Sequence, residues 1–193
     1  MKNLLFIIII TLYYSCSSAQ TIVDMAGERE NKHYDNNQYY IKDINNYMTP
    51  YIGTWNFVDG NKEFRITLTK VTKYHDVYQD NYTNFNYYMD GLLIQYKKFE
   101  NGILVFNSPV ETYPTGIIKE FGKLNMSFTD YERNNESFPV DLILIPNNTM
   151  GSSQQYKLRF KLDKFEQRNT YFEQHPNEPY FSVPNDIEMI KTN

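Results

Sequence analysis

The chain of 193 residues is long enough to fold as one domain with a core of its own. Its formal net charge of -4 excludes the basic footprint of a nucleic-acid-binding protein. Its only alanines, Ala19 and Ala26, disfavour a helical protein, whereas its 18 tyrosines suit the pleated surface of a sheet. A nucleotide bias of the genome would also explain the tyrosine excess.

Residues 1–19 have the pattern of a secretory signal peptide. Lys2 precedes an apolar run, 4–14, that is too short to span a bilayer. Cleavage after Ala19 would release the chain from Gln20, and cleavage before Cys16 would leave a lipidated cysteine. We therefore expect an exported protein, in the periplasm or at the outer membrane or cell surface, attached to a membrane only through such a lipid. Cys16 is the only cysteine, so we expect no disulfide in the mature fold.

Residues 20–49 are polar and predict a tether that leads into the folded domain, residues 50–193. Within this tether, Tyr40, Ile41, Ile44 and Tyr47 have helical spacing, so we expect a short helix over 37–47. Pro50 then favours an extended entry to the first strand.

The folded domain begins with the clearest hairpin signal of the chain. Trp55 and Phe57 lie on one face of a strand, and Asp59-Gly60 provides the turn residues. A second hairpin turn follows at Glu100-Asn101-Gly102. The alternating pattern predicts strands over 52–58, 63–73, 103–106, 124–130, 140–145, 155–162 and 186–191. A further strand is predicted to begin within 84–89 and is clearest over 92–99. The intervening 74–82 is expected to be a loop, and 107–123 a longer interruption.

These elements predict an all-β protein. About eight antiparallel strands with mostly short connections favour an up-and-down barrel, and a two-sheet β-sandwich is the alternative. An eight-stranded barrel has room either for packed side chains or for one small ligand.

Two tripeptides resemble those of the lipocalins and the wider calycin group. Gly53-Thr54-Trp55 is similar to the Gly-x-Trp that opens the first lipocalin strand, and Thr129-Asp130-Tyr131 to a tripeptide near a later turn. Lipocalins commonly place an arginine after the last strands, stacked on that tryptophan. The nearest basic residue here is Lys191, with Arg159 and Arg168 further back. The resemblance implies a lipocalin-like barrel.

A closer resemblance covers nearly the whole chain. It rests on the leader with Cys16 and Ala19-Gln20, the start at Tyr51 to Trp55, Asp90-Gly91-Leu92-Leu93 before Tyr96, Glu100-Asn101-Gly102, and Val183-Pro184 to Lys191. With these features the chain resembles an uncharacterised family of short exported proteins of the Bacteroidota. The resemblance implies a cell-envelope location, and it provides no catalytic residue.

The sequence contains no pattern that predicts an enzyme, a metal or a cofactor. His33, His75 and His175 are far apart, and no Gly-x-Ser-x-Gly is present. His75-Asp76 with Asp80 is a weak candidate for a cation site. Asp130 with Glu132 or Asp141 could form a glycosidase-like carboxylate pair, as could such pairs in any β-protein of this size.

Two functional hypotheses lead, with an unrecognised enzyme as the third, and the residues predict no oligomeric state. In the first, the barrel binds a small apolar or amphipathic ligand, with 107–123 as a lid or rim. Its candidate ligand-binding residues are Trp55, Tyr82, Tyr88, Tyr96 and Tyr113. In the second, the barrel is solid, and the tyrosine-rich 74–88 contacts an envelope protein or a glycan.

Overall fold

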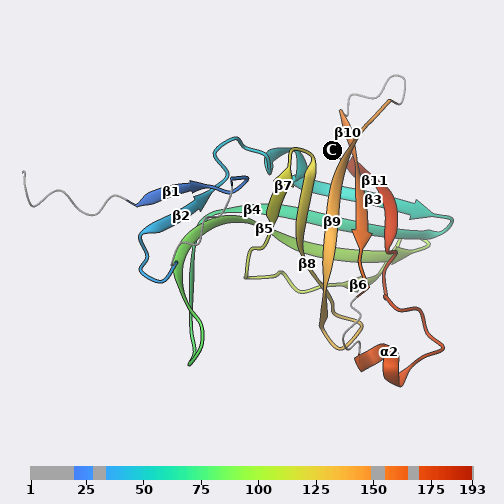
Figure 1. Cartoon of the computed structure of the whole chain (residues 1–193). Coiled ribbons are helices and arrows are strands. Elements are labelled where there is room, and N and C mark those ends of the chain that lie inside the picture. The colour runs from blue at the N-terminus through green and yellow to red at the C-terminus, as the bar shows by residue number, and fades with distance from the viewer. Residues whose placement is uncertain (1–19, 28–33, 149–154, 165–169, 193) are drawn as a thin grey trace, which may run out of the picture.

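The protein is built almost entirely of strands. The computed structural model describes residues 20–27, 34–148, 155–164 and 170–192 (Figure 1). Eleven strands form one mixed sheet in the order β1-β2-β5-β4-β3-β11-β10-β9-β8-β7, and β6 pairs with β5. The strands are β1 (Thr21–Asp24), β2 (Tyr39–Lys42), β3 (Gly53–Asp59), β4 (Lys62–Gln79), β5 (Asn84–Glu100), β6 (Ile103–Asn107), β7 (Ile117–Glu120), β8 (Lys123–Asp130), β9 (Glu136–Pro146), β10 (Tyr156–Leu162) and β11 (Asp186–Thr192).

Only two short helical turns accompany the sheet within the described residues. They are the 3-10 turn η1 (Thr49–Tyr51), which contains Pro50, and the helix α2 (Thr170–Gln174). No described helix has the length and apolar character needed to cross a membrane. The all-β class predicted from the sequence is confirmed.

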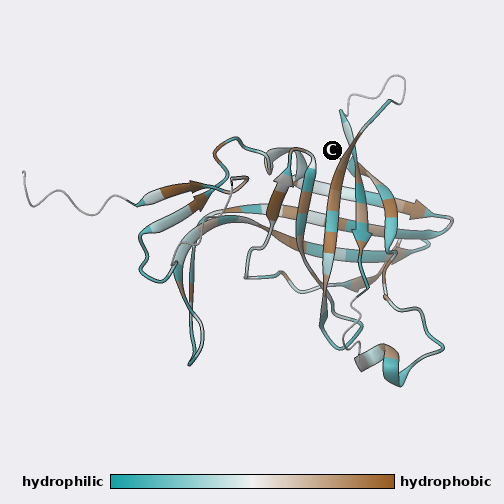
Figure 2. Ribbon diagram, viewed as in Figure 1, coloured by the Kyte–Doolittle hydropathy of each residue, from teal (hydrophilic) through white to brown (hydrophobic). Residues whose placement is uncertain are grey.

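The core lies where the sheet curls over itself, with β8 to β10 running across the direction of β4 and β5 (Figure 1). Hydrophobic and hydrophilic residues alternate along these strands, so that one face is buried (Figure 2). Phe160 on β10 lies with its ring centroid 5.5 Å from Phe64 on β4 and 5.5 Å from Phe128 on β8. Tyr96 lies 5.1 Å from Phe128. Of the two occupants expected for the interior, packed side chains or a small ligand, aromatic side chains fill this part of it.

The predicted eight-stranded barrel is not confirmed, because the sheet has eleven strands and does not close. The nearest approach to closure is between β5 and the chain just before β7. There the Leu92 N–H donates to the Thr115 carbonyl at 2.7 Å, and the Thr115 N–H donates to the Leu92 carbonyl at 2.9 Å. One residue pair is too little to count as a strand, so the sheet remains open between β5 and its end strand, β7. The alternative of two separate sheets is not seen either.

The expected loop over 74–82 is wrong, because β4 and β5 continue there as a two-stranded hairpin. The hairpin bends at Lys73, where the register shifts and φ is 54°. Beyond the bend, Tyr78 pairs with Phe85, and the Asp80 carboxylate accepts the Tyr82 and Thr83 N–H groups in the turn. The extension has little buried face, so its strands lack the alternation that marks a strand in sequence.

The helix expected over 37–47 is also wrong. β2 lies there, parallel to β5, with Tyr40 opposite Tyr88 and Ile41 opposite Met89. The buried Asp90 carboxylate accepts hydrogen bonds from the Tyr40 hydroxyl and the Asp43 N–H. These tertiary contacts override a helical pattern that local spacing alone would allow. The predicted polar tether thus contributes β1, β2 and buried side chains to the fold.

Candidate functional site

The open seam of the sheet is covered by residues 108–116, here called the connecting segment. At one end the Tyr96 N–H donates to Ser108 Oγ at 2.9 Å, and at the other Thr115 pairs with Leu92. The segment approaches β5 closely at Gly91, where an added Cβ would lie 2.9 Å from Cβ of Pro114. Glycine is therefore required there, because any side chain would push the segment off the sheet.

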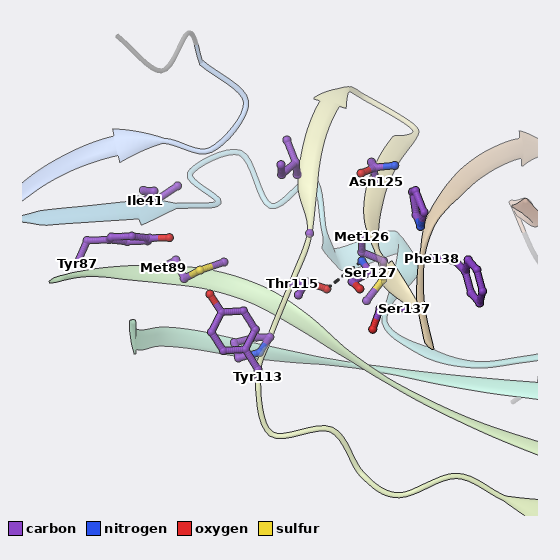
Figure 3. Close-up of a pocket in the computed structure, with 14 residues that line it drawn as sticks. Ile41, Tyr87, Met89, Tyr113, Thr115, Asn125, Met126, Ser127, Ser137 and Phe138 are labelled. Atoms are coloured by element: carbon purple, nitrogen blue, oxygen red, sulfur yellow. Dashed lines mark hydrogen bonds between the residues drawn. The ribbon is translucent and has the colours of Figure 1, made fainter. Parts of the chain in front are cut away.

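An apolar cleft of about 510 Å³ lies beside the connecting segment. Its side chains come from β2, β5, the connecting segment, β7, β8 and β9 (Figure 3). The apolar walls include Ile41, Met89, Ile117, Met126 and Phe138. The volume falls in the range of ligand pockets, roughly 300 to 1,000 Å³.

A second, polar cleft of about 350 Å³ lies on the same seam. It shares Tyr113, Thr115, Ser127 and Ser137 with the apolar cleft, so the two adjoin and form what we call the seam groove. The Ser127 N–H donates to Thr115 Oγ1 at 3.3 Å across the seam (Figure 3). The groove therefore combines an apolar end with an end that offers hydroxyl groups.

Glu111 lines the polar cleft with its carboxylate partly buried. Burial raises the pKa of the Glu111 carboxyl above its usual range, while hydrogen bonds from Thr129 and from the Ile94 backbone lower it in part. Burial disfavours the charged form of a carboxylate unless donors or a cation compensate it.

Tyr113 fastens the connecting segment to the long hairpin. Its hydroxyl donates to the buried Asp76 carboxylate at 2.7 Å, and its ring packs edge-on against Tyr74 at 5.6 Å between centroids. Burial and the neighbouring Asp76 raise the pKa of the Tyr113 hydroxyl, which therefore keeps its proton and remains a donor.

The structure separates the five residues predicted from the sequence to bind a ligand. Trp55 and Tyr96 are buried in the core, and Tyr82 is 97% exposed at the tip of the β4–β5 hairpin. Tyr88 stacks on the His75 ring at 4.4 Å. Of the five, Tyr113 alone is among the described residues that line the seam groove.

Sequence reasoning missed most of the groove because its walls come from five distant parts of the chain. The available signal was the Pro- and Gly-containing interruption over 107–123, part of which forms one wall. Met89 and Phe138 sit in ordinary strand patterns, and no local feature distinguishes them from core residues.

The carboxylates considered for acid–base chemistry have structural partners. Asp130 is fully buried and accepts the N–H and hydroxyl of Ser182 at 2.8 and 2.5 Å. Asp141 accepts from Asn125, and Glu132 pairs with Lys98 at 2.8 Å. His75 bonds to Asn86, and the described residues contain no group of three or more potential metal ligands. Cys16 lies outside the described residues.

A family model matches residues 1–192, nearly the entire chain. The chain belongs to DUF6705, a family of unknown function. Membership of a family without an assigned activity agrees with the resemblance seen in the sequence. Comparison with curated proteins and with solved structures produced no match. The function of this DUF6705 chain therefore has to be argued from the seam groove and the surface.

Proposed function

We propose that this chain is an exported protein of the cell envelope that binds a small apolar or amphipathic ligand in the seam groove. The observation that supports binding is the apolar cleft of about 510 Å³, whose Met126 and Phe138 wall adjoins the hydroxyl groups of Ser127 and Ser137. Pockets that hold small ligands have this composition, with mostly apolar walls and a few polar groups that orient the ligand.

The proposal of export rests on the leader, residues 1–19. Its basic start, short apolar run and small residues before Gln20 fit a signal peptide, and Cys16 is the proposed lipid attachment site. A lipid at Cys16 would tether the chain a few residues before β1. Because this lipid would be the only attachment, the seam groove would lie in water beside the membrane.

The first test is native mass spectrometry of the mature protein, purified from its own host in mild detergent. We expect a stoichiometric adduct beyond any N-terminal lipid, and its mass would identify the ligand class. A bare protein mass would count against ligand binding. The same spectrum distinguishes a chain that starts at lipidated Cys16 from one that starts at Gln20.

Variants then connect the adduct to the groove. Ser137 is exposed and lines both clefts, so Ser137→Trp would fill the groove without disturbing the core. The matched control is Thr69→Trp, on an exposed position of β4 that is not among the groove residues. We expect Ser137→Trp to lose the adduct and Thr69→Trp to keep it. Loss in both variants, or in neither, would place the ligand elsewhere.

A second candidate function is interaction with an envelope protein or a glycan through the β4–β5 hairpin. Its end exposes the apolar and aromatic side chains of Val77, Tyr78, Tyr82 and Phe85. Exposed aromatic side chains gathered on one projecting element are typical of recognition surfaces. Tyr82→Ser with Phe85→Ser should abolish cross-linking to such a partner while leaving the adduct in place.

A further inference from the structure

The seam groove carries a charge at one end. Among the described residues that line either cleft, Glu111 is the only acidic or basic side chain; no other aspartate, glutamate, histidine, lysine or arginine is among them. It lies in the polar cleft, and Ile41, Met89 and Phe138 line the apolar one. A ligand that spans the groove would therefore place one end against a carboxylate and the other among apolar side chains.

The Glu111 carboxylate has spare acceptor capacity. Its described donors are two neutral groups, the Thr129 hydroxyl and the Ile94 N–H, and it forms no ion pair with a described side chain. An ionised carboxylate offers about four acceptor sites. Partial burial makes a charged donor at the remaining sites more favourable than in open water.

The neighbours of Glu111 also favour a cation. Tyr113 and Tyr131 line the same cleft, and aromatic rings attract ammonium groups through their negative faces. No lysine or arginine is among the described lining residues to attract an anionic head group. An anionic amphiphile would meet the Glu111 charge, and a neutral one would leave the carboxylate without a countercharge.

We infer that the ligand of the seam groove is an amphiphile with a primary ammonium group, which binds Glu111 while its apolar chain occupies the cleft lined by Met126 and Phe138. This inference rests on the proposed function and adds the chemical class of the ligand. The ammonium group could belong to a free alkylamine or to the head group of an aminolipid, because both present the same –NH₃⁺ donor.

Isothermal titration calorimetry of the mature protein tests this inference with three probes of one chain length. Decylammonium, decanol and decyl sulfate are each titrated below the concentration at which they form micelles. We expect decylammonium to bind about tenfold more tightly than decanol, since one charge-assisted contact is worth roughly a factor of ten. Decyl sulfate should bind most weakly.

Glu111→Gln removes the charge and keeps the shape of the side chain. It should reduce the affinity of decylammonium to about that of decanol. Glu100→Gln is the matched control, because Glu100 is exposed and lies outside the groove, and it should change neither affinity. Equal binding of decylammonium and decanol to the unaltered protein, or a preference that survives Glu111→Gln, would overturn the inference.

Two further arms separate the remaining outcomes. Short-chain phosphatidylethanolamine compared with its choline analogue tests the lipid source, since only the former has a primary ammonium group. Suppose that decanol binds, that Ser137→Trp blocks its binding, and that decylammonium binds no more tightly than decanol. The proposed function then stands and this inference fails. If no probe binds, both fail.

Discussion

Lys191 near the C-terminus lies over Trp55 on the first strand of the folded domain. Its Nζ is 5.3 Å from the centroid of the indole ring and donates to the Pro50 carbonyl at 3.3 Å. The two residues are also register partners between β3 and β11. Lys191 therefore joins the two strands through a cation–π contact with the indole ring. Burial lowers the pKa of this lysine, so its charge is held partly out of water.

Replacing Lys191 by methionine should destabilise the protein. The ammonium contact with the Trp55 ring is worth about 0.5 to 1 kcal/mol at exposed sites and more when desolvated. Lys191→Arg should retain most of this stability, because a guanidinium also stacks on an aromatic ring. Urea unfolding monitored by tryptophan fluorescence measures the free energy of unfolding of both variants. Lys157→Met is the control, because Lys157 on β10 is partly exposed and pairs with Glu188 instead of an aromatic ring, and an equal loss there would argue against a specific contact.

Asp130 should be among the most sensitive charged residues for stability. Its buried carboxylate joins the end of β8 to the chain before β11 by accepting from Glu132 N–H and from both donors of Ser182. Asp130→Ala leaves these donors without a partner, and we expect a loss of about 3 kcal/mol or more. Chemical denaturation measures the loss. Asp35→Ala, at an exposed position before β2, should change stability by less than about 0.5 kcal/mol. An equally small change for Asp130→Ala would show that the Asp130 carboxylate contributes little to stability.

The hydrogen bond from Tyr113 to Asp76 should couple the connecting segment to the hairpin. Tyr113→Phe leaves the buried Asp76 carboxylate without this donor, at a cost of about 1 to 3 kcal/mol. A double-mutant cycle with Asp76→Asn isolates the pair. We expect a coupling energy above about 0.5 kcal/mol between these contacting residues. Additive effects of the two substitutions would show that the bond contributes little.

Glu111 should make stability depend on pH. Its pKa is raised in the folded state, so the folded protein binds more protons than the unfolded chain above the usual value of 4.5. The protonated Glu111 carboxyl therefore contributes its full stabilisation below pH 4.5, and this stabilisation is lost as the pH rises through the pKa of the folded state. Glu111→Gln should match the unaltered protein at pH 4 and exceed it in stability at pH 7.

Denaturant midpoints at the two pH values measure this difference, with Glu100→Gln as the control. An unchanged or lower stability of Glu111→Gln at pH 7 would contradict the prediction. A stabilising substitution that also weakens ammonium binding would identify Glu111 as a residue retained for function at some cost to stability.

The sequence by itself determined the β-class, the hairpin turns at Asp59-Gly60 and Glu100-Asn101-Gly102, and most strands of the body. These features are local, because a strand with one buried face must alternate and a tight turn needs particular residues. The contact of Lys191 with Trp55 required the folded structure, because the two residues lie at opposite ends of the folded domain's sequence.

Only the tertiary structure decided how the sheet ends and where a ligand could bind. Whether a curled sheet closes depends on the register of distant strands, and here one pair, Leu92 and Thr115, takes the place of a full ladder. The seam groove arises at that gap from residues far apart in the chain. β2 likewise forms because it pairs in parallel with β5 at Tyr88 and Met89. Such long-range contacts leave no periodic trace in the local sequence, and strand formation depends strongly on such context.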